Sequence, residues 1–386
     1  MKKSLVALAL GTLALGIAEF VMMGILPDVA RSLGVSIPRA GHLISAYALG
    51  VCCGAPMLVA AHKYPPKRTL LFLGCLMLFG ALLSVASPNY ATLLCARFVS
   101  GLPHGAYFGV ASIVAVRLAD ERHQTGAVAV MVAGMTVANL LGVPLATSLS
   151  GLLSWRFPFV LVICCALSVI YFVWRWVPDV EALPDKGYRD QFRFLRHERP
   201  WLILLATMLG NGSIFCWYSY VSPQLIHEGG FAPRAVPALM VLAGLGMVAG
   251  NLLSGRLSDR YRPGRVAMAT QCLATGLLVL TFFLAGRGVA SVILMVGCTA
   301  CLFAVSSPLQ FLILKNAPGG EMLGGAAIQV AFNLGNAMGA FLGGLPISAG
   351  LGYCWPALVG APFALLAVGC MWRYCTVERR EGRQPA

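Results

Sequence analysis

The sequence predicts an all-α membrane protein with twelve membrane-spanning helices. Hydrophobic residues make up 59% of the 386 residues and charged residues only 11%, and a soluble fold cannot bury that much apolar surface. Apolar runs long enough to cross a bilayer, which takes about 20 residues in a helix, recur twelve times. They lie at 5–27, 41–61, 69–87, 91–116, 126–151 and 155–177 in the first half, and at 201–226, 235–257, 265–285, 290–314, 322–347 and 352–373 in the second.

The first apolar run follows Lys2 and Lys3 and therefore resembles a secretory signal peptide. It continues beyond the usual core of a signal as far as Pro27, and eleven further runs follow it. We therefore expect an uncleaved first span.

Basic residues lie mainly on one side of the predicted spans. With the N-terminus inside, 22 of the 28 Lys and Arg residues fall in cytoplasmic segments, which follows the positive-inside rule. Both termini are then cytoplasmic, and the net charge of +14 reflects topology. No basic soluble segment remains that would bind nucleic acid.

The second half of the chain repeats the first at an offset of 196 residues, since Gly50 and Gly54 return as Gly246 and Gly250. Glycines four residues apart allow two helices to approach closely. The repeat and the six spans in each half together predict two six-helix bundles related by a pseudo-two-fold axis. We expect the first bundle at 1–177, a cytoplasmic linker at 178–200, and the second bundle with a short cytoplasmic tail at 201–386.

The linker is the only long polar segment between the predicted spans. Its residues Tyr188, Phe192 and Leu195 share one helical face, and arginines at the same spacing lie beside them. This pattern predicts an amphipathic helix on the cytoplasmic membrane surface, with its basic residues toward anionic lipid. Such a helix would tether two bundles that move against each other, and a passive linker is the alternative.

Glu19 is the only one of the fourteen Asp and Glu residues that falls inside a predicted span. A carboxylate near the centre of a membrane helix costs roughly 2.5–3.5 kcal/mol on insertion scales. Such residues usually mark the path of a proton or a substrate. A buried structural carboxylate held by a permanent partner is the alternative interpretation.

Arg97 is the second charged residue inside a span, and its depth makes it a partner for Glu19. At about 1.5 Å per helical residue, both residues lie in the outer half of the membrane, at depths that differ by less than the reach of an arginine. Pairing would lower the cost of burying each charge, and a proton would bind Glu19 only when the pair opens. Opening during the conformational change would couple protons to transport, whereas a permanent salt bridge would not.

His104 shares a helical face with Arg97 and Gly101 and lies near the middle of the membrane. Histidine titrates close to physiological pH, so this side chain could relay a proton or hydrogen-bond a substrate. It could equally be a packing residue. The proton-coupling candidates are therefore Glu19, Arg97 and His104.

The second half carries neutral polar residues, and Phe215 occupies the position equivalent to Glu19. Amides and aromatic rings suit a neutral hydroxylated ligand, through hydrogen bonds to its hydroxyl groups and ring contacts with its C–H groups. Hydrogen bonds between helices are the competing explanation for many of them. The candidate substrate-binding residues from both halves are His42, Tyr107, Thr136, Asn139, Asn211, Trp217, Tyr218, Gln310, Gln329 and Asn333, with Tyr220 and Asn336 in the same spans.

The sequence contains no complete catalytic or metal-binding motif. Cys298 and Cys301 have the spacing of a redox or metal pair, yet they lie in an apolar run with no histidine or second pair nearby. Small buried hydrophobic residues are the better explanation for these and the other cysteines. We expect a protein that is not an enzyme and has neither metal nor cofactor, with a proton gradient as its energy source.

Four segments carry a resemblance to a known family: 18–27 (AEFVMMGILP), 97–105 (RFVSGLPHG), 134–144 (GMTVANLLGVP) and 255–260 (GRLSDR). With them, the chain resembles the major facilitator superfamily from end to end. Within it, the chain is most similar to the drug:proton antiporter branch and the AraJ-type sugar exporters of bacteria. The resemblance implies a twelve-helix exporter of the bacterial inner membrane that works by alternating access and is driven by proton exchange.

The resemblance also implies roles for single residues. Arg97 stands where the fourth span of the family has an arginine assigned to proton transfer. Gly255, Asp259 and Arg260 match a gating signature in which the aspartate and arginine latch the cytoplasmic side closed.

Two departures from the family pattern are visible. In the first-half copy of the latch, Lys63 stands where the aspartate belongs. In the antiporter signature of the fifth span, Val143 separates Gly142 from Pro144. The first departure weakens the latch, and the second leaves the direction of transport open.

These observations predict a proton-coupled secondary transporter that exports a small neutral polar solute, similar to a sugar or nucleoside. A multidrug:proton antiporter for amphipathic compounds is the first alternative, and a membrane sensor or scaffold that transports nothing is the second. The expected partners are a small-molecule substrate, protons and the lipid bilayer, with no nucleic acid and with the chain as a monomer.

Overall fold

The computed structural model describes residues 2–55, 57, 64–119, 124–180, 193–318 and 321–381, and within these ranges the chain is helical almost throughout and has no strand. Eleven helices or pairs of consecutive helices in the described ranges are long and apolar enough to cross a membrane. The prediction of an all-helical membrane protein is confirmed. The predicted second span contains α2 (Ile37–Gly54), but most of its later residues lie outside the described ranges, so the count of twelve stays a prediction.

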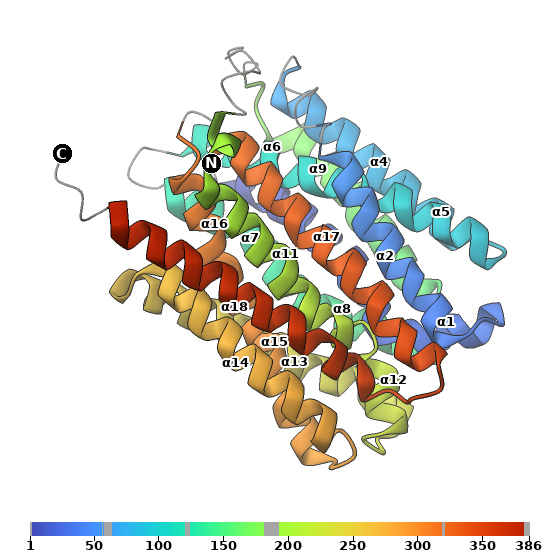
Figure 1. The fold of residues 1–386 in the computed structure, drawn as a ribbon. Helices are drawn as coiled ribbons and strands as arrows, with labels where there is room; N and C mark the ends of the chain where they lie inside the picture. Colours follow the sequence, from blue (N-terminus) through green and yellow to red (C-terminus); the bar gives the residue numbers. More distant parts are fainter. Residues whose placement is uncertain are drawn as a thin grey trace. The chain divides into compact units, whose positions relative to one another are not determined.

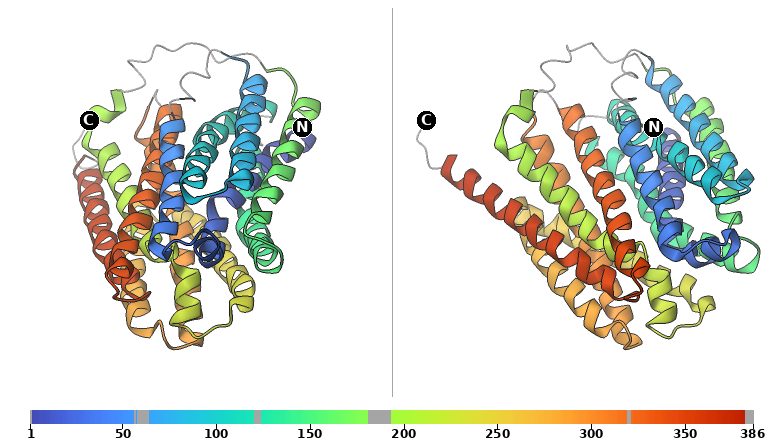
Figure 2. Two further views of the ribbon diagram at one scale, coloured as in Figure 1. Left: turned by 90° about the vertical axis from the view of Figure 1, so that its right-hand side faces the viewer. Right: turned by 45° about the vertical axis from the view of Figure 1, so that its right-hand side comes forward.

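The contacts divide the chain into two compact units, and the first comprises Met1–Asp185 with Pro233–Val241. In this unit α1 lies centrally, because it packs on α2, α7, α8 and α9, while α2 packs on α5 and α4 packs on α9 (Figures 1 and 2). Its helices are α1 (Lys2–Leu33), α2, α4 (Pro66–Ala86), α5 (Tyr90–Gly101), α6 (Pro103–Leu118), α7 (Gln124–Val137), the π-helical turn η2 (Ala138–Gly142), α8 (Val143–Leu152) and α9 (Phe157–Trp176).

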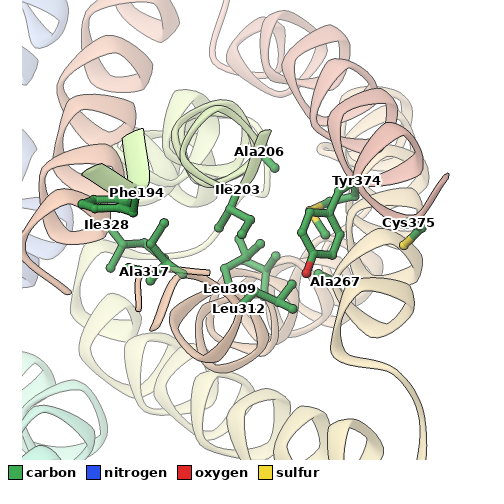
Figure 3. Close-up of a cluster of buried hydrophobic side chains, with 13 residues drawn as sticks. Phe194, Ile203, Ala206, Ala267, Leu309, Leu312, Ala317, Ile328, Tyr374 and Cys375 are labelled. Carbon is green, nitrogen blue, oxygen red and sulfur yellow. The ribbon is translucent and has the colours of Figure 1, made fainter. Parts of the chain in front are cut away.

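The second unit comprises Lys186–Ala232 with Leu242–Ala386. Here α11 packs on both α17 and α18, and α14 packs on α18. Figure 3 shows part of its apolar core, where Ile203, Leu309, Leu312 and Tyr374 gather. The elements that follow α9 are η3 (Arg193–Arg196), α11 (Glu198–Tyr218), α12 (Val221–His227), η4 (Pro233–Ala235), α13 (Val236–Arg260), α14 (Pro263–Leu284), α15 (Val289–Ala304), α16 (Ser306–Lys315), α17 (Glu321–Ser348) and α18 (Trp355–Glu381).

The repeated glycines make the close helix contacts that the sequence predicts. A Cβ atom on Gly50 would lie 2.1 Å from the backbone oxygen of Phe98 on α5, and one on Gly250 would lie 2.0 Å from the backbone oxygen of Ala300 on α15. The contact of α2 with α5 in the first unit therefore has its counterpart in the contact of α13 with α15 in the second.

In the described part of the chain, three spans divide into two α-helices near a proline. Proline has no backbone N–H and cannot continue the hydrogen-bond ladder of an α-helix. Pro103, Pro223 and Pro308 each lie within the first three residues of the helix that follows an interruption, between α5 and α6, α11 and α12, and α15 and α16. The first interruption lies beside a candidate site residue, because His104 comes directly after Pro103.

The fifth span contains the π-helical turn η2, in which the N–H of Val143 donates to the carbonyl of Ala138. A π turn closes its hydrogen bond over one more residue than an α turn, so it accommodates an additional residue while helix continues on both sides. This accounts for Val143 between Gly142 and Pro144, which the family signature lacks.

The predicted amphipathic linker helix falls mainly on residues 181–192, outside the described ranges. The part that is described, Arg193–Arg196, forms the short 3₁₀ turn η3, with Phe194 buried. The tether therefore stays a prediction.

Candidate functional site

Three ionisable side chains predicted to handle protons are all buried in the first unit. Glu19 on α1 is 8% exposed, Arg97 on α5 is 0% exposed and His104 on α6 is 2% exposed. Oε2 of Glu19 lies 3.8 Å from Nε2 of His104, which is within ion-pair distance when the imidazole is protonated. The structure therefore brings Glu19 and His104 together from helices far apart in the sequence.

Arg97 reaches α1 next to Glu19. Its Nη1 donates to the carbonyl of Ala18 at 2.7 Å, and its Nε donates to the carbonyl of Leu43 on α2 at 3.4 Å. Its Nη2 is buried and has no hydrogen-bond partner among the described residues. The guanidinium is thus held by backbone oxygens, one of them in the residue before Glu19, and a direct Glu19–Arg97 pair stays a prediction.

Tyr47 is a further member of this cluster, which the sequence reasoning missed. It lies on α2, is 1% exposed, and places its hydroxyl oxygen 2.9 Å from Nδ1 of His104. The guanidinium carbon of Arg97 lies 4.4 Å from the centre of its ring, a cation–π contact. Tyr47 therefore joins Arg97 to His104.

A signal for Tyr47 was present in the sequence. Tyr47, Gly50 and Gly54 are spaced three and four residues apart, so they share one face of α2. Since the glycines mark the face that meets another helix, Tyr47 had to lie in the same contact. The structure bears this out, because a Cβ atom on Gly101 of α5 would lie 2.1 Å from the backbone oxygen of Tyr47.

The helix interruption sets the position of His104. The N–H of Leu102 donates to the carbonyl of Val99 at 3.2 Å, and α6 begins with Pro103. The imidazole stacks on Phe108 of its own helix, with ring centres 5.2 Å apart. His104 therefore both packs and contacts Glu19, so the two interpretations of this residue do not exclude each other.

The second unit has apolar residues where the first has this cluster. Phe215 lies 196 residues after Glu19 and Ala243 lies 196 after Tyr47. On the fourth span of each half, the glycine contacts match Phe98 with Val296, which makes Met295 the counterpart of Arg97. All three counterparts are buried, so the ionisable cluster belongs to one half of the repeat.

Several of the predicted solute-binding amides take part in hydrogen bonds between or within helices. The side-chain amide of Asn211 on α11 donates to the side-chain oxygen of Asn336 and, at 3.2 Å, to the carbonyl of Phe332, both on α17. Asn139 and Asn333 each donate to the carbonyl four residues earlier, at 3.0 Å in both cases. These amides therefore stabilise helices in this conformation.

Of the buried polar atoms in the second unit that keep unused hydrogen-bonding capacity, two belong to Asn333 and to Gln224, the hydrogen-bond partner of Trp217. Trp217 donates its indole N–H to Oε1 of Gln224 at 2.7 Å, across the interruption between α11 and α12. Nε2 of Gln224 and Oδ1 of Asn333 are buried and have no hydrogen-bond partner in the described part of the chain. One is a donor and the other an acceptor.

The other predicted solute-binding residues have varied surroundings. The hydroxyl of Tyr107 donates to the carbonyl of Leu8 at 3.4 Å, and Nδ1 of His42 lies 3.3 Å from the hydroxyl of Tyr90. Tyr218 is buried. The partly exposed members of the set are His42, Thr136, Gln310 and Gln329.

The predicted gating residues lie at the end of α13, where Gly255 is partly exposed and Arg260 is exposed. The side chain of Asp259 and the whole of Lys63 lie outside what the structure describes. The latch therefore stays a prediction. No group of three His, Cys, Asp or Glu residues that could hold a metal ion occurs among the described residues.

A helical chain with many spans, and with an ionisable cluster buried inside one half of an internal repeat, has the architecture of a multi-pass membrane transporter. The chain belongs to the major facilitator superfamily, whose family model matches residues 8–324. A bacterial homologue of the human lysosomal transporter Spinster has the same fold, with a TM-score of 0.76, 15% sequence identity, and coverage of 99% of this chain and 98% of that one.

Relatives at higher identity span nearly the full length of the chain. A protein of Escherichia coli K12 named as the transporter AraJ is 47% identical over 99% of this chain and 97% of its own length. A protein of Streptomyces lividans named for chloramphenicol resistance is 32% identical, covering 95% of each chain. A protein of Helicobacter pylori J99 named as a sugar efflux transporter is 28% identical over 93% of this chain and 92% of its own length. Members of this family are transporters and not enzymes. The prediction that this chain is a transporter is therefore confirmed.

Proposed function

We propose that this transporter is a proton-coupled exporter of a small neutral polar solute, with twelve spans and both termini on the cytoplasmic side of a bacterial inner membrane. The observation that carries the proposal is the buried contact between Glu19 and His104, in a chain whose other acidic residues lie outside the predicted spans. A carboxylate at that depth is costly to keep, and proton transfer gives it a use.

Arg97 supports a mechanism in which Glu19 changes partner. Breaking a buried ion pair leaves an uncompensated charge, which costs about 3–5 kcal/mol. Glu19 can therefore leave its partners readily only after it has taken up a proton. The unused N–H on Nη2 of Arg97 offers the ionised carboxylate a second hydrogen-bond donor within the same cluster. Protonation would then release Glu19 and permit the rearrangement of the helices.

A neutral solute fits the residues of the second unit. Nε2 of Gln224 and Oδ1 of Asn333, two of the buried polar atoms there with unused capacity, belong to uncharged amides. They suit hydroxyl groups, which both donate and accept hydrogen bonds. The H. pylori relative named as a sugar efflux transporter supports a sugar-like solute, and the match of residues 8–324 supports alternating access as in the family.

A multidrug:proton antiporter is the second candidate. The observation that favours it is the S. lividans relative named for chloramphenicol resistance, which is the more similar of the two at 32% against 28% identity. The two candidates differ in the solute that is transported, so an assay of transport with each solute decides between them.

The proposal can be tested with purified protein in proteoliposomes. A pH gradient would drive uptake of labelled D-glucose, D-xylose, uridine or chloramphenicol in separate assays. We expect Glu19→Gln to insert normally and to abolish gradient-driven flux, while exchange without a gradient continues. Glu378→Gln is the matched control, since Glu378 is an acidic residue at the far end of α18 that lies 3.7 Å from Lys315. Unchanged gradient-driven flux in Glu19→Gln would refute proton coupling at this site, and transport of chloramphenicol alone would favour the second candidate.

A further inference from the structure

We propose that Tyr47 is a positioning residue that keeps the proton of neutral His104 on Nε2, the nitrogen that faces Glu19. This inference rests on the proposed function, because it concerns the same proton site. The geometry that suggests it is a continuous series of contacts from Arg97 to Tyr47, from Tyr47 to His104, and from His104 to Glu19. Three helices besides α6 contribute to it.

The two nitrogens of His104 meet different partners. A neutral imidazole has one N–H donor and one acceptor nitrogen, and the bond made by one nitrogen decides the state of the other. If the Tyr47 hydroxyl donates to Nδ1 at 2.9 Å, the proton must be on Nε2, which points an N–H toward Oε2 of Glu19 at 3.8 Å. The opposite tautomer would place a nitrogen lone pair against an ionised carboxylate, so Tyr47 and the charged form of Glu19 favour the same tautomer.

Arg97 orients Tyr47 for this task. The guanidinium lies over the ring face at 4.4 Å and is itself fixed by the carbonyls of Ala18 and Leu43. A positive charge over the ring also favours the phenol as a hydrogen-bond donor. The absence of a side chain at Gly101 lets α5 approach the backbone of Tyr47 closely. Arg97 thus acts on His104 through Tyr47.

The Tyr47 hydroxyl has a second acceptor, which allows the arrangement to reverse. It lies 3.4 Å from the carbonyl of Leu15 on α1. Once Glu19 has taken up a proton, its O–H can donate to Nε2, Nδ1 then carries the imidazole proton toward the Tyr47 oxygen, and the hydroxyl turns to Leu15. The two arrangements differ by the single proton that Glu19 gains, while His104 and Tyr47 each hold one proton in both.

Within the described ranges, the polar contacts of His104 are those with Tyr47 and Glu19. The helices packed against α6 are α1, α2, α4, α5 and α7. Glu19, Tyr47 and Arg97 come from α1, α2 and α5, and the described side chains of α7 include no titratable residue. On α4 the titratable residues are Lys67, Arg68 and Cys75, all partly or largely exposed. The protonation of Glu19 is therefore the change to which His104 responds.

The tautomer can be measured directly by NMR on the full-length protein in nanodiscs with ¹⁵N-labelled histidine. His104→Gln identifies the His104 signals among those of the six histidines by subtraction. We expect wild-type His104 near neutral pH to be protonated on Nε2. Tyr47→Phe should change the ratio of the two tautomers by about fivefold or more, as expected for the loss of one buried hydrogen bond.

Tyr374→Phe is the matched control. It also removes a buried tyrosine hydroxyl, one that lies 3.1 Å from the amide of Asn316 in the second unit. The control should leave the His104 tautomer unchanged. A wild-type His104 protonated on Nδ1 would overturn the proposal even if Tyr47→Phe did not fold, and an unaltered ratio in a folded Tyr47→Phe variant would overturn it as well.

Transport assays separate this inference from the proposed function. If Tyr47→Phe changes the tautomer and also shifts the pH profile of gradient-driven flux, both stand. If the tautomer changes while wild-type flux is independent of the pH gradient, the positioning role of Tyr47 stands and proton coupling fails. If coupled flux is normal in Tyr47→Phe and its tautomer is unchanged, proton coupling stands and the role of Tyr47 fails.

Discussion

Replacing Gly50 by alanine tests whether the α2–α5 contact holds the proton site together. The added Cβ atom would lie 2.1 Å from the backbone oxygen of Phe98, against 3.4–4 Å for an ordinary contact. The helices would have to separate by about 1 Å or more, and overpacking of this kind costs about 1–3 kcal/mol. Alanine also gains about 1 kcal/mol in helix propensity over glycine, so the comparison needs a control that shares this gain.

Gly276→Ala on α14 supplies the control, because Gly276 is also inside a helix and a Cβ atom there would meet nothing within 4 Å. The difference in stability between the two variants then isolates the strain. At about 2–4 °C per kcal/mol for a unit of this size, Gly50→Ala should have a Tm roughly 2–12 °C below that of Gly276→Ala in a thermal unfolding assay in detergent. Equal Tm values would refute the inference that the contact is closely packed.

Gly250→Ala separates stability from function. Its Cβ atom would lie 2.0 Å from the oxygen of Ala300, so the strain in the second unit should be similar. Because that unit lacks the ionisable cluster, Gly250→Ala should leave the His104 tautomer as it is. Gly50→Ala should change it, since Tyr47 lies one turn before Gly50. An identical effect of both variants on His104 would show that the contact acts only through general stability.

Three further changes test contacts elsewhere in the chain. Arg156→Gln removes the guanidinium hydrogen bonds at 3.1 and 2.8 Å to the carbonyls of Val85 and Ser87 at the end of α4. It should lower the free energy of unfolding by about 1–3 kcal/mol, measured as a lower Tm than that of the control variant Arg234→Gln. Glu228→Gln weakens the bond at 3.0 Å from the N–H of Tyr353 to the carboxylate, and amide hydrogen exchange at Tyr353 should become several times faster while exchange in α14 stays constant. Asn336→Leu leaves the amide of Asn211 without its side-chain acceptor and should lower the free energy of unfolding by about 1–2 kcal/mol. The double variant with Asn211→Leu should recover part of that loss. A double variant whose loss of stability equals the sum of the two single losses would contradict the pairing.

The spans could be predicted from the sequence because hydrophobic length alone determines them. The predicted first span of 5–27 is shorter than the observed α1 (Lys2–Leu33), which continues through Pro27. A proline inside a membrane helix can be tolerated when neighbouring helices satisfy the freed carbonyl, and α1 packs against several helices, α7, α8 and α9 among them. Sequence patterns do not report such neighbours.

The candidate site could be predicted in part. Charge inside a span identified Glu19 and Arg97, because each is a costly exception to its surroundings. The spacing of Tyr47 from Gly50 and Gly54 places it in a helix contact, but only its partners in the packed structure reveal its role. The amides of Asn211 and Asn336 illustrate the opposite limit, since their residue type suits a solute as well as it suits each other. Pairing between spans is a property of the packed structure, and no local pattern carries it.

The ionisable cluster lies in one half of the repeat, and the cost of buried charge bears on why. The contact of α2 with α5 and its counterpart in the second unit are built on the same glycines, so the packing does not depend on the ionisable residues. Phe215, Ala243 and Met295 show that apolar side chains fill the equivalent positions without polar partners. The repeated scaffold is therefore stable with no charge at these positions. The cluster of Glu19, Tyr47, Arg97 and His104 adds an energetic cost to one half only, and a group retained at such a cost is best explained by the chemistry that it performs.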